Sequence, residues 1–145
     1  MSPVARERRG WRGRADEGSA AVEFLAVGVL LLVPLAYLVL TLGRLQAATF
    51  AAESGAREAS RVLARTDGEA TARRWAQEAV VLALADQGFT AAPGALELEC
   101  AADPCRSPEA VVAATVRVEV ALPLLPGAVP VQVRRVAVAD RFVGS

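Results

Sequence analysis

The sequence predicts an α+β protein: a long N-terminal helix, a second short helix and a small antiparallel sheet of about three strands. Two observations lead to this prediction. Up to about residue 87, apolar residues recur at helical spacing. After Pro93-Gly94 they alternate with polar residues, which is typical of half-buried strands. Because the helices precede the strands, we expect them to cover one face of the sheet.

The first helix opens with an apolar run from Ala20 to Leu42, in which Glu23 is the only group ionised at neutral pH. As a helix, this run is about 34 Å long, enough to cross a hydrocarbon core of about 30 Å. A cleaved secretory signal has a shorter apolar stretch followed by a small-residue cleavage site. The residues after Leu42 form a poor site of that kind. We therefore expect a retained transmembrane helix over residues 19–43.

Arginines ahead of this helix favour a cytoplasmic N-terminus. Residues 1–18 carry five arginines against three acidic residues, and arginine near a membrane tends to remain on the cytoplasmic side. Arg44, Arg57 and Arg61 weaken the contrast from the other side. We expect a basic cytoplasmic leader over 1–18 and an extracytoplasmic domain over 44–145. The protein is then a single-pass protein of the cell membrane.

The two cysteines agree with this orientation. Cys100 and Cys105 stand in the turn-rich stretch C-A-A-D-P-C. A disulfide between them fits an oxidising compartment and would contribute about 2 kcal/mol. Two unpaired thiols are the alternative. A zinc ion would lack ligands, since the chain has no His and no further Cys. We expect neither a metal nor another cofactor.

Beyond the membrane, the first helix is expected to continue to about Ala64. Small and apolar residues keep a three-four spacing there: Leu42, Leu45, Thr49, Ala52, Ala56, Ala59 and Leu63. Such a stripe lets another element approach closely, either in this protein's own domain or in another subunit. The following Thr66-Asp67-Gly68-Glu69 predicts a break and a capping box, with Thr66 as the cap and Glu69 reaching back.

A second helix is predicted to run to about Asp86 and to end at Gly88, so that the helices of the outer domain occupy 44–87. One face of this helix would hold Ala72, Trp75, Ala79 and Leu82. Trp75 is then expected in the core.

Three strands are predicted in the β region 95–141. Leu96 to Glu99 alternates, and Val112 to Leu122 alternates with its apolar residues on one face. Residues 123–127 form a turn, and a third strand starts near Val129. The inward valines of that strand change parity at Arg134-Arg135, which predicts a β-bulge.

The start of the apolar helix reads R-A-D-E-G-S-A-A-V-E-F-L. It resembles the processing site of type IV prepilins, in which a membrane aspartyl peptidase cuts after the glycine and the helix is retained. The resemblance implies a cut between Gly18 and Ser19, and a subunit-assembly role for Glu23. A charge at mid-membrane costs about 3 kcal/mol, and less near the edge. The new ammonium of Ser19 on a neighbouring subunit would neutralise Glu23. Alternatively, Glu23 lies at the interface and only complements the helix dipole.

Longer segments extend this resemblance. The stretches G-S-A-A-V-E-F, G-V-L-L-L-V-P-L-A-Y-L-V-L and Q-A-A-T-F-A-A-E-S-G-A-R-E-A-S-R look like the TadE-like pseudopilins of tight-adherence (Flp) pilus systems. The C-x4-C pair, the A-L-P-L-L-P-G turn and the closing A-D-R-F are similar to the same group. Pro34 departs from the pattern, because the family's proline commonly lies closer to the glutamate, and it predicts a kink.

The resemblance implies a minor pilin-like subunit (a pseudopilin) that assists pilus assembly and is not an enzyme. Its expected partners are the membrane bilayer, other pilin-like subunits, inner-membrane pilus assembly proteins and the prepilin peptidase. The alternative is a signal-anchored cell-envelope domain with an unrelated binding role, which leaves Glu23 without a purpose.

Two further functions are disfavoured. The acidic residues show no paired-carboxylate or metal spacing, and there is no glycine-rich phosphate loop, which argues against a membrane-tethered enzyme. The arginines of residues 6–14, with Trp11 among them, could contact phosphate. Beside a membrane they favour topology signalling and anionic-lipid contact, so no nucleic-acid partner is expected.

Overall fold

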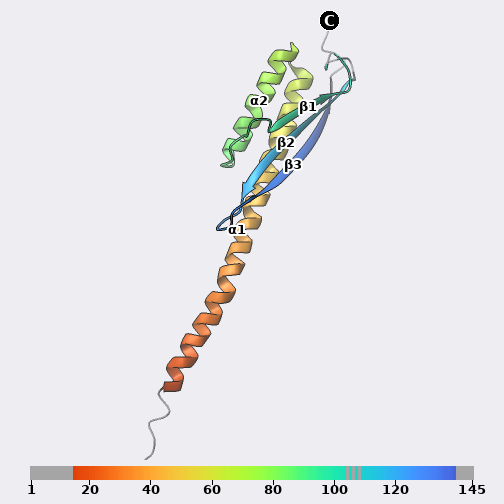
Figure 1. The fold of residues 1–145 in the computed structure, drawn as a ribbon. Helices are drawn as coiled ribbons and strands as arrows, with labels where there is room; N and C mark the ends of the chain where they lie inside the picture. Colours follow the sequence, from red (N-terminus) through yellow and green to blue (C-terminus); the bar gives the residue numbers. More distant parts are fainter. Residues whose placement is uncertain (1–14, 104, 106, 108, 140–145) are drawn as a thin grey trace, which may run out of the picture. The chain divides into compact units, whose positions relative to one another are not determined.

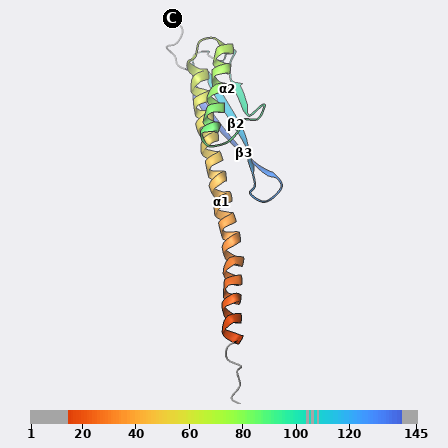
Figure 2. The same cartoon turned by 90° about the vertical axis from the view of Figure 1, so that its left-hand side faces the viewer.

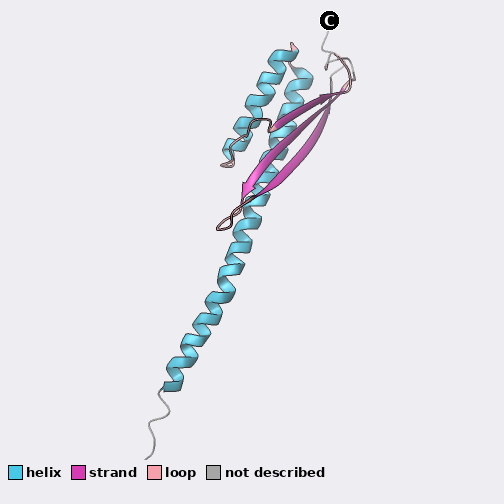
Figure 3. Cartoon of the chain, viewed as in Figure 1, coloured by secondary structure: helices cyan, strands magenta, loops and turns pink. Residues whose placement is uncertain are grey.

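The computed structural model describes residues 15–103, 105, 107 and 109–139. These residues form two helices followed by three strands (Figures 1 and 3). The elements are α1 (Ala15–Arg65), α2 (Glu69–Asp86), β1 (Leu96–Cys100), β2 (Val111–Ala121) and β3 (Ala128–Val138). The predicted α+β class is therefore confirmed, with its long helix, short helix and three-stranded antiparallel sheet. Most of the predicted leader, residues 1–14, lies outside the described residues.

The chain divides between Val39 and Leu40 into two compact units. The first unit contains most of the apolar part of α1. Most of its leucine, valine and phenylalanine side chains are exposed; Phe24, for example, is 78% exposed and Leu30 is 73% exposed. By length and composition α1 could cross a membrane, and none of its most apolar 18-residue window is buried. The helix continues through Pro34.

The second unit begins with the remaining part of α1, whose buried face consists mainly of alanine. Its buried residues are Ala48, Ala51, Ala52, Gly55, Ala56, Ala59, Ser60, Leu63 and Ala64. The helix α2 packs closely there, since a Cβ added to Gly55 would lie 3.5 Å from the Cα of Val80. The predicted stripe is therefore buried inside the protein's own domain from Ala52 to Leu63, whereas Leu42 and Thr49 are exposed.

The sheet has the order β1-β2-β3, and both pairings are antiparallel. Figures 1 and 2 show both helices on one side of it. The inward face of β2 has the residues that the alternation predicts, namely Val112, Ala114, Val116, Val118 and Val120, all buried. From Ala114 to Val120 they form one core with the alanines of α1 and with Ala76, Val80 and Leu84 of α2.

The predicted β-bulge at Arg134-Arg135 is wrong. β2 and β3 keep one register without interruption, from Val111 opposite Val138 to Ala121 opposite Ala128. Alternation therefore continues, and Val136 is 54% exposed on the outer face. Arg135 takes the inward position that the bulge would have given to a valine. The long arginine side chain can occupy this position because its guanidinium group pairs with the Glu53 carboxylate of α1.

The predicted core face of α2 is also wrong. Its buried residues are Ala72, Ala76, Val80 and Leu84, whereas Trp75 is 48% exposed and Leu82 is 65% exposed. Both sets have helical spacing, so periodicity alone could not separate them. Close approach to Gly55 suits small and medium side chains better than an indole ring.

The start of α2 differs from the predicted capping box. Gly68 is the N-cap residue, and no side chain caps the helix. Thr66 instead donates its backbone N–H to Val62, which extends the hydrogen bonding of α1 by one residue. Glu69 pairs with Arg73 at 2.8 Å. Gly68 has φ +80°, a left-handed conformation that glycine adopts without steric cost and that makes the tight reversal between the helices possible.

The end of α2 agrees with the prediction. The helix ends at Asp86, and Gly88 adopts a φ of +76°. The N–H of Gly88 donates to Ala85 and that of Phe89 to Leu84, which is the Schellman pattern of a glycine C-cap. This turn directs Phe89 back onto the core.

Candidate functional site

The predicted processing and assembly residues lie near the start of α1. Gly18 is already part of the helix, and the side chains of Ser19 and Glu23 are both exposed. Residues four apart lie on the same face of a helix, separated by a rise of about 6 Å. Ser19 and Glu23 therefore share one face, surrounded by exposed apolar side chains such as Val22 and Phe24.

Cys100 and Cys105 form the predicted disulfide. It links the end of β1 to the loop before β2, and the Cys105 residue is 6% exposed. The Nη2 atom of Arg73 lies 3.9 Å from the Cys105 sulfur, so the bridge contacts the first turns of α2. Neither cysteine is a free thiol. The bridge holds Cys105 beside the start of α2, and both cysteines have a structural role.

A partly exposed ion cluster of Glu53, Arg57 and Arg135 joins α1 to β3. The Glu53 carboxylate on α1 accepts hydrogen bonds from Arg135 of β3 and, at 3.0 Å, from Arg57. The hydrogen bond from Arg135 and then its charge hold the pKa of Glu53 below its ordinary value of 4.5, and Arg57 adds to this effect. The Glu53 side chain is 29% exposed. The cluster therefore fixes the sheet edge to the helix while remaining in reach of water.

Sequence reasoning missed this cluster. The predicted bulge would place Arg135 on the outer face of the sheet, where its charge needs no partner on α1. Part of the cluster can be predicted from the sequence. Without a bulge, period-two alternation places Arg135 on the face that carries Val131 and Val133. The Nε atom of Arg135 is buried and has no hydrogen-bond partner among the described residues.

The outer face of the sheet carries solvated ion pairs between strands. Arg117 of β2 pairs with Glu97 of β1 at 2.8 Å, and Arg134 of β3 pairs with Glu99 of β1 at 2.6 Å. About half of each of these side chains is exposed. Exposed pairs of this kind contribute about 0–1 kcal/mol each. Within the described residues, no group of three His, Cys, Asp or Glu side chains could hold a metal ion.

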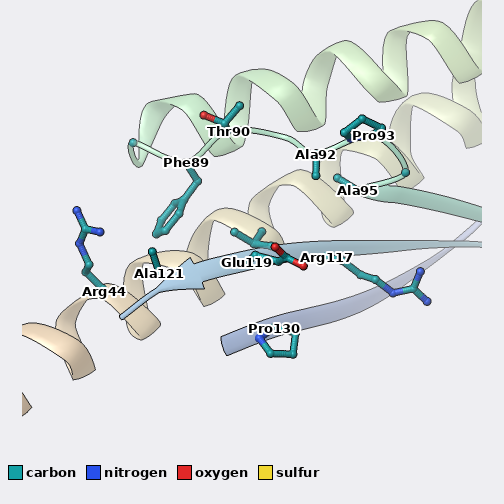
Figure 4. Close-up of a pocket in the computed structure, with 13 residues that line it drawn as sticks. Arg44, Phe89, Thr90, Ala92, Pro93, Ala95, Arg117, Glu119, Ala121 and Pro130 are labelled. Carbon is teal, nitrogen blue, oxygen red and sulfur yellow. The ribbon is translucent and has the colours of Figure 1, made fainter. Parts of the chain in front are cut away.

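An open groove of about 630 Å³ lies in the second unit between α1, the segment after α2, and the end of β2 (Figure 4). Figure 4 shows Arg44 of α1 beside Ala121, with the ring of Phe89 over the same end of β2. Arg117, Glu119 and Pro130 also line it. No ion pair among the described residues involves Arg44. The groove has two arginines, one glutamate and several apolar residues in its walls, but no assembled set of reactive groups.

Comparison with known proteins adds no relative to this geometry. No protein-family model, no curated protein and no solved structure matches the chain.

Proposed function

We propose that this chain is a minor pilin-like membrane subunit, a pseudopilin, that assists assembly of a tight-adherence (Flp) pilus. The observation that carries the proposal is the division of α1 into two parts. From Ser19 onward the first part is apolar and exposed, and it bears one carboxylate, Glu23, about one turn from the Gly18–Ser19 bond. The second part is buried beneath a short helix and a three-stranded sheet.

The first part of α1 supports a membrane role because most of its leucine, valine and phenylalanine side chains are exposed. Exposed leucine, valine and phenylalanine over more than twenty residues are unfavourable in water but favourable in hydrocarbon, and a helix satisfies its own backbone hydrogen bonds there. In the proposed orientation the arginine-rich leader is cytoplasmic and the sheet domain is extracytoplasmic, with the disulfide on the oxidising side.

Glu23 supports assembly rather than simple anchoring. A carboxylate among exposed apolar side chains requires a cationic partner once it enters the bilayer. Cleavage after Gly18 would create an ammonium at Ser19, and helices staggered by about one turn would bring that ammonium of one subunit to Glu23 of the next. Cutting requires local unwinding of α1, and the glycine lowers the helix stability there by about 1 kcal/mol relative to alanine.

The prepilin-peptidase step is tested by the intact mass of the full chain, extracted from membranes of cells with and without an active prepilin peptidase. We expect loss of residues 1–18 only where the peptidase is active. Gly18→Leu is expected to retain the leader in both strains. A full-length chain in the peptidase-positive strain would contradict cleavage at this bond.

The assembly step is tested by Glu23→Gln, which removes the charge with little change in shape. We expect fewer assembled pili on the cell surface, with an unchanged amount of the subunit in the membrane. Glu78→Gln is the matched control, because Glu78 is an exposed carboxylate on α2, outside the apolar segment. Normal piliation with Glu23→Gln would instead favour the alternative of a signal-anchored envelope domain with an unrelated binding role.

A further inference from the structure

The turn between β2 and β3 displays two leucines with almost no cover. Leu124 is 92% exposed and Leu125 is 55% exposed. Leu124 also has φ +62°, a left-handed conformation that is sterically unfavourable for a branched, non-glycine residue. Pro123 and Pro126 flank the pair, and each fixes its own φ. The turn is therefore a rigid apolar tip.

Within the second unit, this tip lies near the residues of α1 at which the apolar run ends. Figure 4 shows Arg44 of α1 beside Ala121, which is the last residue of β2 before the turn, and both residues line the groove. The apolar run ends at Leu42, two residues before Arg44 and within the same compact unit. The tip and the end of the apolar run thus occupy one end of one unit.

The charge pattern around the tip also fits a lipid surface. No charged residue occurs from Val120 to Val133, although charged residues are frequent in the rest of the sheet. Arg44 is exposed at the neighbouring position, and none of the ion pairs among the described residues uses it. An apolar tip with a cationic side chain nearby matches the chemistry of a bilayer interface, where acyl chains lie beneath phosphate groups.

We propose that the β2–β3 turn is a second membrane contact, in which Leu124 and Leu125 enter the outer interface of the bilayer and Arg44 lies at the level of the lipid phosphates. This inference rests on the proposed membrane anchoring by α1. The contact holds the sheet domain in one orientation on the membrane while the subunit is anchored there. It forms whether or not the subunit takes part in pilus assembly.

The test uses the full chain in phosphatidylcholine/phosphatidylglycerol vesicles, with a nitroxide attached through Leu124→Cys and no reductant, so that the native disulfide stays closed. The matched control is Val138→Cys, because Val138 is 60% exposed and lies at the opposite end of β3. We expect the label at position 124 to collide more with oxygen and less with a water-soluble nickel chelate than the label at position 138. Leu125→Cys should give the same shift, which guards against a local effect of one substitution.

Equal nickel accessibility at positions 124 and 138 would overturn the proposal. Low accessibility to both oxygen and nickel at position 124, increasing when protein is diluted in lipid, would also overturn it, because a neighbouring copy would then cover the tip. Co-flotation of each labelled chain with the vesicles separates these results from a failure of the anchor. A chain that does not float overturns both proposals, whereas a floating chain with an aqueous tip overturns only the membrane contact.

Discussion

The two parts of α1 are equally helical but differ in the size and exposure of their apolar side chains. In the first part, leucine, valine and phenylalanine side chains are mostly more than half exposed. In the second part, the buried face from Ala48 to Ala64 is mostly alanine, and α2 approaches it closely at Gly55. Helical propensity does not distinguish the two parts, since alanine and leucine are both good helix formers.

The difference shows what each part packs against. Small side chains on one face of a helix let a second helix pack closely against it. The contact then includes the backbone of the second helix as well as its side chains. Large flexible side chains on all faces favour a fluid environment that adapts to them, such as lipid acyl chains. A change in side-chain size along one helix therefore marks the position where its surroundings change.

The largest effect is expected where α2 covers the second part of α1. Leu84→Ala removes a fully buried side chain and should lower the free energy of unfolding of the second unit by about 2–5 kcal/mol. Leu82→Ala, at a position that is 65% exposed, should change it by about 0.5 kcal/mol or less. Denaturant unfolding of the full chain in mild detergent, followed by circular dichroism, measures both. An equal loss of unfolding free energy in both variants would mean that the face of α2 with Leu82 is also buried, contrary to the structure.

Ala56→Leu tests the size rule directly. Ala56 is fully buried, so the added methylenes must displace α2 or the sheet, and we expect a loss of about 1–3 kcal/mol. The same substitution in the first part of α1, Ala26→Leu, is at an exposed position and should leave unfolding of the second unit unchanged. If both variants unfolded like the original chain, the contrast between the two parts of α1 would have no energetic basis.

Gly55→Ala should act in the opposite direction. The added Cβ would meet Val80 at 3.5 Å and Ala83 at 3.6 Å, which are ordinary contacts, and alanine stabilises a helix interior by about 1 kcal/mol relative to glycine. We expect a gain of up to about 1 kcal/mol in the same unfolding experiment. Gly28→Ala, where nothing lies within 4 Å of the added Cβ, is the matched change in the first part. A loss on Gly55→Ala would mean that the helices need closer contact than described.

The smallest effect is expected from the Glu53–Arg135 ion cluster, because Glu53 retains contact with water. Its pKa is lower in the folded chain than its ordinary value of 4.5. The cluster therefore stabilises the fold above that value, and this contribution is lost as the pH falls from about 4.5 through the lower, folded pKa. We expect Glu53→Gln to make unfolding less dependent on pH in this acidic range. Glu58→Gln, which removes the exposed pair with Arg61 on the same helix, should retain the acid dependence of the original chain.

Much of the fold follows from patterns of residues that are close together in the sequence. The apolar run gave the long helix, the alternation from Val112 to Leu122 gave the central strand, and Gly88 gave the end of α2. The turn-rich stretch between Cys100 and Cys105 and the expected oxidising compartment favoured a disulfide over two unpaired thiols. Each of these features depends on residues that are close in sequence, where backbone geometry allows few arrangements.

The tertiary structure decided what those patterns left equivalent. Two faces of α2 were apolar, and the close approach of Gly55 to Val80 selected the one without Trp75. Two arrangements of β3 were compatible with its valines, and Glu53, 82 residues away, admitted Arg135 to the inward face. Which segments form helices and strands follows from the sequence alone, because those choices depend on neighbours along the chain. Which side of α2 and of the end of β3 is buried was decided by the folded structure, because that choice depends on the shape and charge of a distant partner.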